Sequence, residues 1–223
     1  MSWESTLPYY ETINRVVSQR LGGLHSAEIL LRSIDFHPIE VLQRGGKWAE
    51  AGEILAKEAH GLQQAGADFL VLCTNTMHKV LPRIESAVEI PILHIADATS
   101  KRIDLAGLTR LALLGTRYTM EDDFYRERLV EFSGFQVLIP TEEEREIVHN
   151  IIYEELCHGL VLETSRRAYV EITSALVSRG AEGIILGCTE IGMILKEIDS
   201  EVPLFDTAQI HAEEAAIFAL DGD

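Results

Sequence analysis

The sequence predicts an α/β fold built from two copies of one unit. Short apolar runs, bounded by Gly-Ala breaks and polar turns, alternate with stretches of helical periodicity, which is typical of parallel strands covered by helices on both faces. Residues 66–77 also align with residues 180–191, which indicates an internal duplication. Together these observations predict parallel sheets in two related halves of the chain.

The same elements are expected in each copy. In copy one, helical periodicity covers 48–64 and a buried strand follows at 69–72; in copy two, the helix covers 165–178 and the strand covers 184–187. A further strand end is expected at 34–36. Each main strand leads into polar residues and then into another helix-like stretch.

Copy two opens with a strand that has no counterpart in copy one. Residues 111–115 form an apolar run, the polar residues 116–119 read as a turn, and the acidic start of 121–125 predicts a helix. The repeat places Thr116 on Met1, so copy one begins just after the point where its own first strand should end. Either the natural start lies several residues upstream, or copy one has lost the strand, which would leave a sheet edge unpaired.

Composition and charge exclude several classes of function. The 223 residues include 36 acidic and 19 basic side chains, and the resulting charge of −17 opposes binding to nucleic acids and to anionic membrane surfaces. We expect a cytoplasmic protein, because no leader-like or membrane-spanning apolar segment stands out. The cysteines match neither a disulfide framework nor a metal knuckle, and the histidines lack metal-ligand spacing. Each cysteine is therefore expected to be a free thiol, and no metal site is predicted.

Cys188 stands at the end of a strand, where open parallel sheets bind ligands. The helix expected after it would lower the pKa of the thiol and increase the thiolate fraction. A cysteine that only packs is the alternative, because cysteine is among the most buried residue types. The duplication favours a functional role, since Gly-Cys-Thr-Glu in copy two aligns with the polar Cys-Thr-Asn-Thr in copy one.

These two strand-end segments carry a resemblance to a known family. Residues 184–192 resemble the second signature of aspartate and glutamate racemases, and residues 71–78 resemble the first. The resemblance extends to three more segments: 1–6, 115–119 and 205–211. It implies two pseudo-symmetric three-layer α/β lobes with the active site between them, an amino-acid substrate and no cofactor.

The sequence departs from the family pattern at one position. The cysteine of the first signature immediately precedes an asparagine, and that position is Thr74 here. Cys73 lies one residue earlier and so points to the other side of an extended strand. The internal alignment independently pairs Thr74 with Cys188. We therefore expect Cys73 to be structural, and Thr74 and Cys188 to act on opposite faces of the substrate.

These features predict a cofactor-independent racemase of aspartate, glutamate or a related amino acid. Inverting a stereocentre requires removal of the Cα proton on one face and return of a proton on the other. We expect the Cys188 thiolate to abstract the proton from one enantiomer, which the resemblance suggests is the L form, while Thr74 relays a proton from solvent. Two alternatives stay open: a one-cysteine decarboxylase or cis-trans isomerase of small dicarboxylic acids, and an inactive ligand-binding relic.

Ten further residues are expected to contact the substrate, although helix capping or packing would explain several of them equally well. They are Met1, Ser2, Gln43, Asn75, Thr76, Thr116, Thr119, Cys157, Thr189 and Glu190. Glu190 either tunes the thiol pKa or only favours a helix start. Cys157 stands where aspartate racemases often carry a lysine, so strict specificity for acidic substrates is not expected.

The expected lobes comprise residues 1–97 with 207–223, and residues 98–206. The resemblance implies a homodimer, for which Trp3, Tyr9 and Tyr10 are candidate interface residues, although aromatic side chains equally often fill a core. The expected ligand is a small-molecule amino acid, with no nucleic-acid or membrane partner.

Overall fold

The computed structural model describes residues 1–222 and shows an α/β protein with two parallel sheets. The larger sheet has the order β4-β3-β5-β6, and its strands are β3 (Arg110–Gly115), β4 (Gln136–Leu138), β5 (Gly183–Gly187) and β6 (Leu204–Asp206). The smaller sheet pairs β1 (Leu70–Val71) with β2 (Ile92–Leu93). All neighbouring strands run parallel, so the α/β class expected from the sequence is confirmed.

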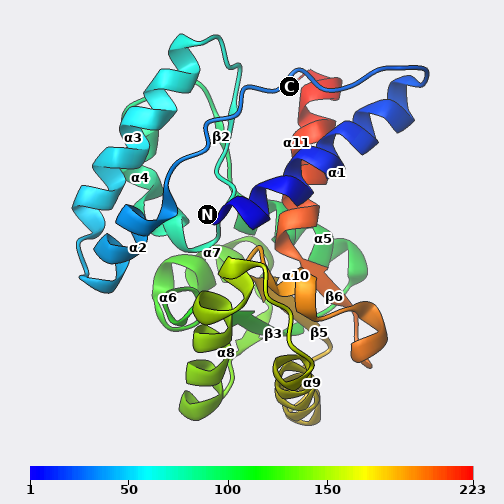
Figure 1. Ribbon diagram of the computed structural model, residues 1–223. Helices are drawn as coiled ribbons and strands as arrows, with labels where there is room; N and C mark the ends of the chain where they lie inside the picture. The colour runs from blue at the N-terminus through cyan, green and yellow to red at the C-terminus, as the bar shows by residue number, and fades with distance from the viewer. Residues whose placement is uncertain (223) are drawn as a thin grey trace.

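Helices surround both sheets and form two lobes in Figure 1. The upper lobe holds the smaller sheet with α1 (Trp3–Leu21), α2 (Phe36–Arg44), α3 (Trp48–Gln64), η1 (Thr76–Val80), α4 (Leu81–Glu85) and α11 (Thr207–Asp221). The lower lobe holds the larger sheet with α5 (Ile95–Ala106), α6 (Arg117–Glu121), α7 (Asp123–Ser133), α8 (Glu142–Glu154), η2 (Leu156–His158), α9 (Glu163–Ser178), α10 (Ile191–Ile194) and η3 (Glu197–Asp199). The boundary expected between residues 97 and 98 falls inside α5, whereas the one at residue 207 coincides with the start of α11.

The core of the lower lobe is centred on β3 and β5, whose apolar side chains are buried on both faces. The two strands end side by side, with Gly115 paired to Gly187. A Cβ added to Gly187 would lie 2.6 Å from Cδ1 of Leu113 and 2.9 Å from the carbonyl oxygen of Leu114. Glycine therefore permits the close approach of the strands immediately before Cys188.

The helices expected from the sequence form where the periodicity placed them, since α3 covers 48–64 and α9 includes 165–178. The strand end expected at 34–36 is wrong. The Asp35 side chain accepts a hydrogen bond from the His37 N–H at 3.1 Å and caps α2, which begins at Phe36. The turn expected at 116–119 is also wrong, because it is the short helix α6.

The smaller sheet contains no counterpart of β3 within residues 1–222. β3 lies between β4 and β5, whereas β1, which matches β5 in the internal repeat, pairs with β2 alone. The helix caps refine the alignment: Ser2 before α1 has φ −60° and ψ 162°, and Thr116 before α6 has φ −64° and ψ 159°. Ser2, rather than Met1, is therefore the structural counterpart of Thr116.

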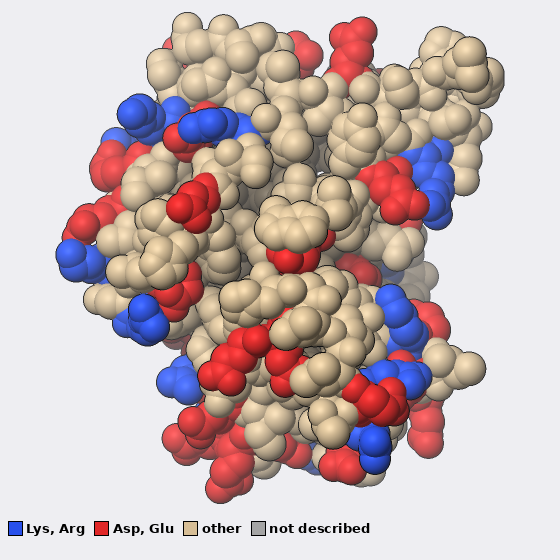
Figure 2. Space-filling view, in the orientation of Figure 1, with Lys and Arg blue, Asp and Glu red and all other residues tan. Residues whose placement is uncertain are grey.

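The surface carries the acidic excess of the sequence. On the face shown in Figure 2, acidic and basic side chains are spread over both lobes, and acidic ones gather over the lower lobe. Every helix within residues 1–222 is too short or too polar to span a bilayer.

Candidate active site

A small cavity lies between the lobes, at the carboxyl ends of β1 and β5. Its volume of about 20 Å³ is room for about one water molecule. Ten of the residues expected at the site line it: Met1, Gln43, Thr74, Asn75, Thr76, Thr116, Cys157, Cys188, Thr189 and Glu190. The other two, Ser2 and Thr119, lie behind this lining and hydrogen-bond to Glu190 and Thr76, respectively. The fold thus brings together residues that are far apart in the sequence.

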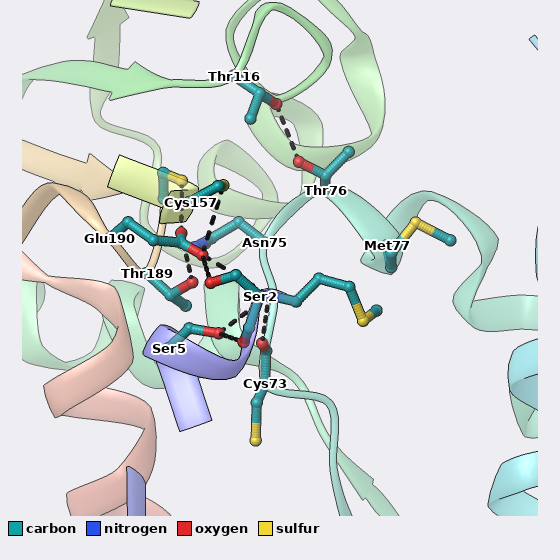
Figure 3. A network of polar contacts seen from close by, with 12 residues as sticks. Ser2, Ser5, Cys73, Asn75, Thr76, Met77, Thr116, Cys157, Thr189 and Glu190 are labelled. Carbon is teal, nitrogen blue, oxygen red and sulfur yellow. Dashed lines mark hydrogen bonds and ion pairs between the residues drawn. The ribbon is translucent and has the colours of Figure 1, made fainter. Parts of the chain in front are cut away.

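The carboxylate of Glu190 is the centre of a hydrogen-bond network, shown in Figure 3. Its Oε2 accepts hydrogen bonds from Sγ of Cys188 at 2.9 Å and from Oγ1 of Thr189 at 2.8 Å. Its Oε1 accepts one from Oγ of Ser2 at 2.6 Å, with the Met1 ammonium 3.9 Å away. The network connects the start of the chain to the end of β5.

The network fixes the resting protonation state of the site. Burial and the negative charge of Glu190 raise the pKa of the Cys188 thiol well above its ordinary value. Burial alone would also raise the pKa of Glu190, but the Met1 ammonium and three hydrogen bonds bring it below its ordinary value. A protonated thiol therefore rests beside an ionised carboxylate. This corrects the expected lowering of the thiol pKa, because α10 begins only at Ile191 and has four residues.

Thr74 lines the same cavity from the upper lobe, three residues after the end of β1. Its carbonyl oxygen lies 2.7 Å from Nδ1 of His78, which must donate, and Nε2 of His78 accepts from the Ile95 N–H at 3.3 Å. Burial lowers the pKa of His78 to about 3, which keeps the ring neutral. The backbone at Thr74 is thereby tied to the start of α5.

Cys73 faces another part of the upper lobe. Its Sγ donates to the carbonyl oxygen of Val71 at 3.6 Å, and the side chain lines a separate cavity beside β1. Burial raises the pKa of Cys73 to about 12, so the thiol stays protonated. This placement supports a structural role for Cys73.

Three threonine hydroxyls from both lobes meet at one side of the cavity. Oγ1 of Thr76 lies 2.9 Å from Oγ1 of Thr116 and 3.3 Å from that of Thr119, and the latter two are 3.2 Å apart. Figure 3 shows Thr76 and Thr116 pointing toward one another across the junction. Hydroxyl groups rotate freely between donor and acceptor roles, so this cluster can turn its protons toward an anion.

Asn75 adds a polar group with an unused acceptor. Its Nδ2 donates to Oγ1 of Thr207 at 3.0 Å, whereas its buried Oδ1 is without a hydrogen-bond partner within residues 1–222. Buried polar atoms are nearly always satisfied, and an exception calls for a reason such as a ligand. The Asn75 carbonyl is therefore a candidate acceptor for a substrate ammonium group.

The sequence did not identify Phe36, Ile152 and Tyr153, which also line the cavity. The Tyr153 hydroxyl donates to Oε1 of Gln43 at 3.0 Å, and its ring stacks on Phe36 with 6.4 Å between centroids. Tyr153 lies four residues before Cys157, so helical spacing from that cysteine could have indicated it. Phe36 carried no such signal, because its region was interpreted as a strand.

Within residues 1–222, no group of three or more His, Cys, Asp or Glu side chains is arranged to hold a metal ion.

Residues 1–215 match the model of the Asp/Glu/hydantoin racemase family. The chain belongs to this family. Among curated relatives, the broad specificity amino-acid racemase RacX of Bacillus subtilis is 27% identical over 154 residues, and the match covers 66% of this chain and 63% of RacX. The chain thus spans less than two thirds of the RacX length.

Solved structures of family members are more similar. An Asp/Glu racemase candidate from Yersinia pestis is 54% identical with a TM-score of 0.90, over 99% of this chain and 96% of that one. An aspartate racemase homologue from Pyrococcus horikoshii is 34% identical with a TM-score of 0.80, over 98% and 94% of the two chains. The chain therefore shares the fold of these structures over nearly its whole length.

Proposed function

We propose that the protein is a cofactor-independent racemase of aspartate, glutamate or a related amino acid. The observation that carries the proposal is the hydrogen bond between Cys188 and Glu190 at a small cavity that Thr74 also lines. A thiol with an adjacent proton acceptor on one side and a hydroxyl from the other lobe supplies two distinct proton-transfer groups. Family membership supports the same reaction class.

Cys188 requires Glu190 to act as a base. In the resting state the thiol is protonated, so its proton first passes to Oε2 of Glu190, 2.9 Å away. The thiolate then takes the proton from Cα, the C–H electron pair stays on carbon, and the substrate carboxylate delocalises the negative charge. When the reaction runs in reverse, the Cys188 thiol returns a proton to Cα.

Thr74 supplies the proton-transferring group on the face of the substrate opposite Cys188. A threonine hydroxyl is a very poor base but can pass a proton from solvent to the carbanion and be reprotonated in turn. The two half-reactions therefore differ in their chemistry. Because two enantiomers have equal free energy, kcat/KM must nevertheless be equal in both directions, and any asymmetry appears in kcat and KM separately.

Polar groups of both lobes suit an amino-acid backbone. The hydroxyls of Thr76, Thr116 and Thr119 can donate to the substrate carboxylate, and Oδ1 of Asn75 can accept from its ammonium group. The cavity of about 20 Å³ holds about one water, so the lobes or their side chains must separate to admit a substrate.

The substrate side chain need not be acidic. The cavity lining includes no lysine or arginine within residues 1–222, and Cys157 stands where the resemblance to aspartate racemases implies a lysine. The broad specificity stated for RacX agrees with such a pocket. We propose aspartate and glutamate as the first substrates to test, followed by neutral amino acids.

Chiral chromatography of single L-amino acids incubated with the purified protein tests this function. A D-enantiomer as product is the expected result. A decarboxylated or isomerised dicarboxylic acid would instead support the other one-cysteine reactions, and binding without turnover would support a ligand-binding relic. Either of these outcomes would overturn racemisation.

We also propose that the protein forms a homodimer through α1. Trp3, Leu7 and Tyr10 lie at helical spacing and are 65%, 58% and 57% exposed, whereas Tyr9 is buried against His211. An exposed stripe of large apolar side chains is typical of an interface. Light scattering should give twice the monomer mass, and Leu7→Arg should give a monomer; a wild-type monomer at all concentrations would contradict the dimer.

A further inference from the structure

A second thiol lies beside the one assigned to proton transfer. Cys157 and Cys188 line the same small cavity, and Cys157 packs against the apolar core cluster that includes Cys188. Both are free thiols, as is Cys73, which lines a different cavity in the upper lobe. The proposed racemisation uses Cys188 and gives the thiol of Cys157 no chemical role.

The two thiols of the active-site cavity share one hydrogen-bond acceptor. Sγ of Cys188 donates to Oε2 of Glu190 at 2.9 Å, and Sγ of Cys157 donates to Oε1 of the same carboxylate at 4.0 Å. Figure 3 shows the contact from Cys157 to Glu190. Because one carboxylate contacts both sulfur atoms, the two thiols lie close together and have a common proton acceptor.

This carboxylate is the group that can deprotonate either thiol. Burial raises the pKa of Cys157 to about 12 and the pKa of Cys188 well above its ordinary value, so both thiols are protonated at rest. A thiolate, and not a thiol, reacts with an oxidant or with another sulfur atom. Glu190 is buried and ionised, and it therefore supplies the acceptor that each thiol needs.

The fold holds the two cysteines with unequal firmness. Cys188 follows β5, whose residues are buried in the core of the lower lobe. Cys157 lies in the short turn η2, which leads into the exposed residues 160–162 before α9 begins. A three-residue turn beside an exposed loop shifts more easily than a central strand, so Cys157 is the thiol that can move toward its neighbour.

We propose that Cys157 and Cys188 form a reversible disulfide when a small hydroperoxide enters the cavity, and that this bond switches off the thiol chemistry of Cys188. The opening of the lobes that admits an amino acid also admits hydrogen peroxide. The loss of turnover rests on the proposed function, whereas the formation of the bond does not. The pair is thus a redox-sensitive modification site within the active site.

The reaction has two balanced steps. Glu190 takes the proton of Cys188, the thiolate attacks one oxygen of hydrogen peroxide, the O–O bond breaks, and hydroxide leaves and takes the proton back as water. Cys157 then loses its proton to Glu190, and its thiolate attacks the sulfenic sulfur of Cys188. The S–S bond forms, the S–O bond breaks, and hydroxide again leaves as water. The two thiols are oxidised to a disulfide, and the peroxide is reduced to water.

Peptide mapping of the oxidised protein tests the pairing directly. Cleavage after lysine and arginine places each cysteine on its own peptide, namely 58–79, 146–166 and 180–196. The full chain is exposed to hydrogen peroxide, unfolded, treated with a maleimide to block the remaining thiols, digested, and analysed by mass spectrometry without a reductant. Racemase activity is measured in parallel, before and after treatment with dithiothreitol.

The wild-type protein should yield the peptides 146–166 and 180–196 joined within one chain, with Cys73 still free. The fraction of activity lost should equal the fraction of chains that carry this bond, and dithiothreitol should restore it. Cys157→Ser cannot form the bond, so its Cys188 should gain two or three oxygen atoms, and dithiothreitol should not restore its activity. Cys73→Ala, the matched control, should respond as the wild type does.

Three results of the mapping would overturn the proposal: a bond that includes Cys73, a bond between two chains, or a wild-type Cys188 that stays free or carries oxygen atoms in place of the bond. Equal recovery of the wild type and Cys157→Ser after reduction would also overturn it. The mapping needs no turnover. A joined pair of peptides in a protein that racemises no amino acid would contradict the proposed function and leave the disulfide established.

Discussion

At the residue scale, Cys188 and Glu190 share one hydrogen bond, and the position of its proton determines whether the thiol or the thiolate is present. Burial and the neighbouring carboxylate keep the thiol protonated, while the Met1 ammonium and hydrogen bonds keep Glu190 ionised. If the partial positive charge of a helix start had ionised the thiol, Cys188 would need no carboxylate to accept its proton. In the proposed mechanism, Glu190 is accordingly a positioning and proton-accepting group for Cys188.

Glu190→Gln removes the acceptor and its charge. We expect the thiol pKa of Cys188 to fall, since the carboxylate is the largest cause of its elevation after burial. Turnover should nevertheless decrease by at least about 10²-fold, because the thiol loses the group that accepts its proton. Thiolate absorbance against pH and racemisation rates measure the two effects. Glu201→Gln, at an exposed position, should change neither; an unchanged thiol pKa in Glu190→Gln would contradict the pairing.

Thr74→Ala separates proton removal from racemisation. Cys188 should still exchange the α-proton of one enantiomer, but the opposite face lacks its hydroxyl, so conversion to the other enantiomer should fall by about 10²-fold or more. Thr74→Ser keeps the hydroxyl and should keep conversion. Deuterium incorporation and chiral chromatography on the same samples measure both rates. Full racemisation by Thr74→Ala would remove Thr74 from the mechanism.

The residues of the site were more predictable from the sequence than their interactions. The internal repeat placed Thr74 opposite Cys188, and both line the cavity. The bond between Cys188 and Glu190 was not predictable, because it depends on where α10 begins and on how the chain bends between residues 188 and 190. Tyr153 was not predictable either, because it lies on α8 and only tertiary packing determines which side of that helix faces the cavity.

At the scale of elements, the approach of β3 to β5 sets the position of Cys188. Gly187→Ala should destabilise the fold by roughly 1–3 kcal/mol, because its Cβ would overlap with Leu113 and the Leu114 carbonyl of β3. Gly61→Ala, where a Cβ meets nothing within 4 Å, should instead stabilise α3 by about 1 kcal/mol. Urea unfolding measures both. Equal stabilities of the two variants would contradict the close approach.

Elements with a clear repeating pattern of apolar residues formed as predicted. Elements that were inferred from only a few residues did not. The helix at 48–64 and the strand at 184–187 have apolar patterns that only one structure buries. At 34–36 a local cap overrode the apolar pattern, because Asp35 bonds the N–H of His37 and starts a helix. At 116–119 the side chain of Thr116 likewise caps a helical turn.

Across the whole molecule, the buried His78 and His211 and the partly buried His94 join the lobes. His78 lies 4.4 Å from His94 and 6.2 Å from His211 between ring centroids. Nε2 of His211 donates to the carbonyl oxygen of Leu93, so its Nδ1 accepts from the hydroxyl of Tyr9 at 2.8 Å. The cluster connects α1 and α11 with β2 and α5.

Acid should therefore unfold the protein. Burial lowers the pKa of each of these histidines from 6.5 to about 3, so the unfolded chain binds more protons than the folded one between these values. The stability is fully present above pH 6.5 and is lost as the pH falls toward 3. Urea midpoints between pH 7.5 and pH 4 measure the decline. His94→Gln should reduce the change of the urea midpoint with pH, whereas His60→Gln, at an exposed position, should not. If the two variants showed the same change with pH, the role of the histidine cluster would be contradicted.

Exchange of the α-proton in deuterated water tests the central claim most directly. The wild-type protein should incorporate deuterium at Cα of its amino-acid substrate, and Cys188→Ala should lose this exchange by at least about 10²-fold. Cys73→Ala, the matched control, should exchange as the wild type does, because Cys73 faces the upper-lobe cavity. Exchange by Cys188→Ala at the wild-type rate would contradict the assignment of Cys188 as the proton-transferring thiol.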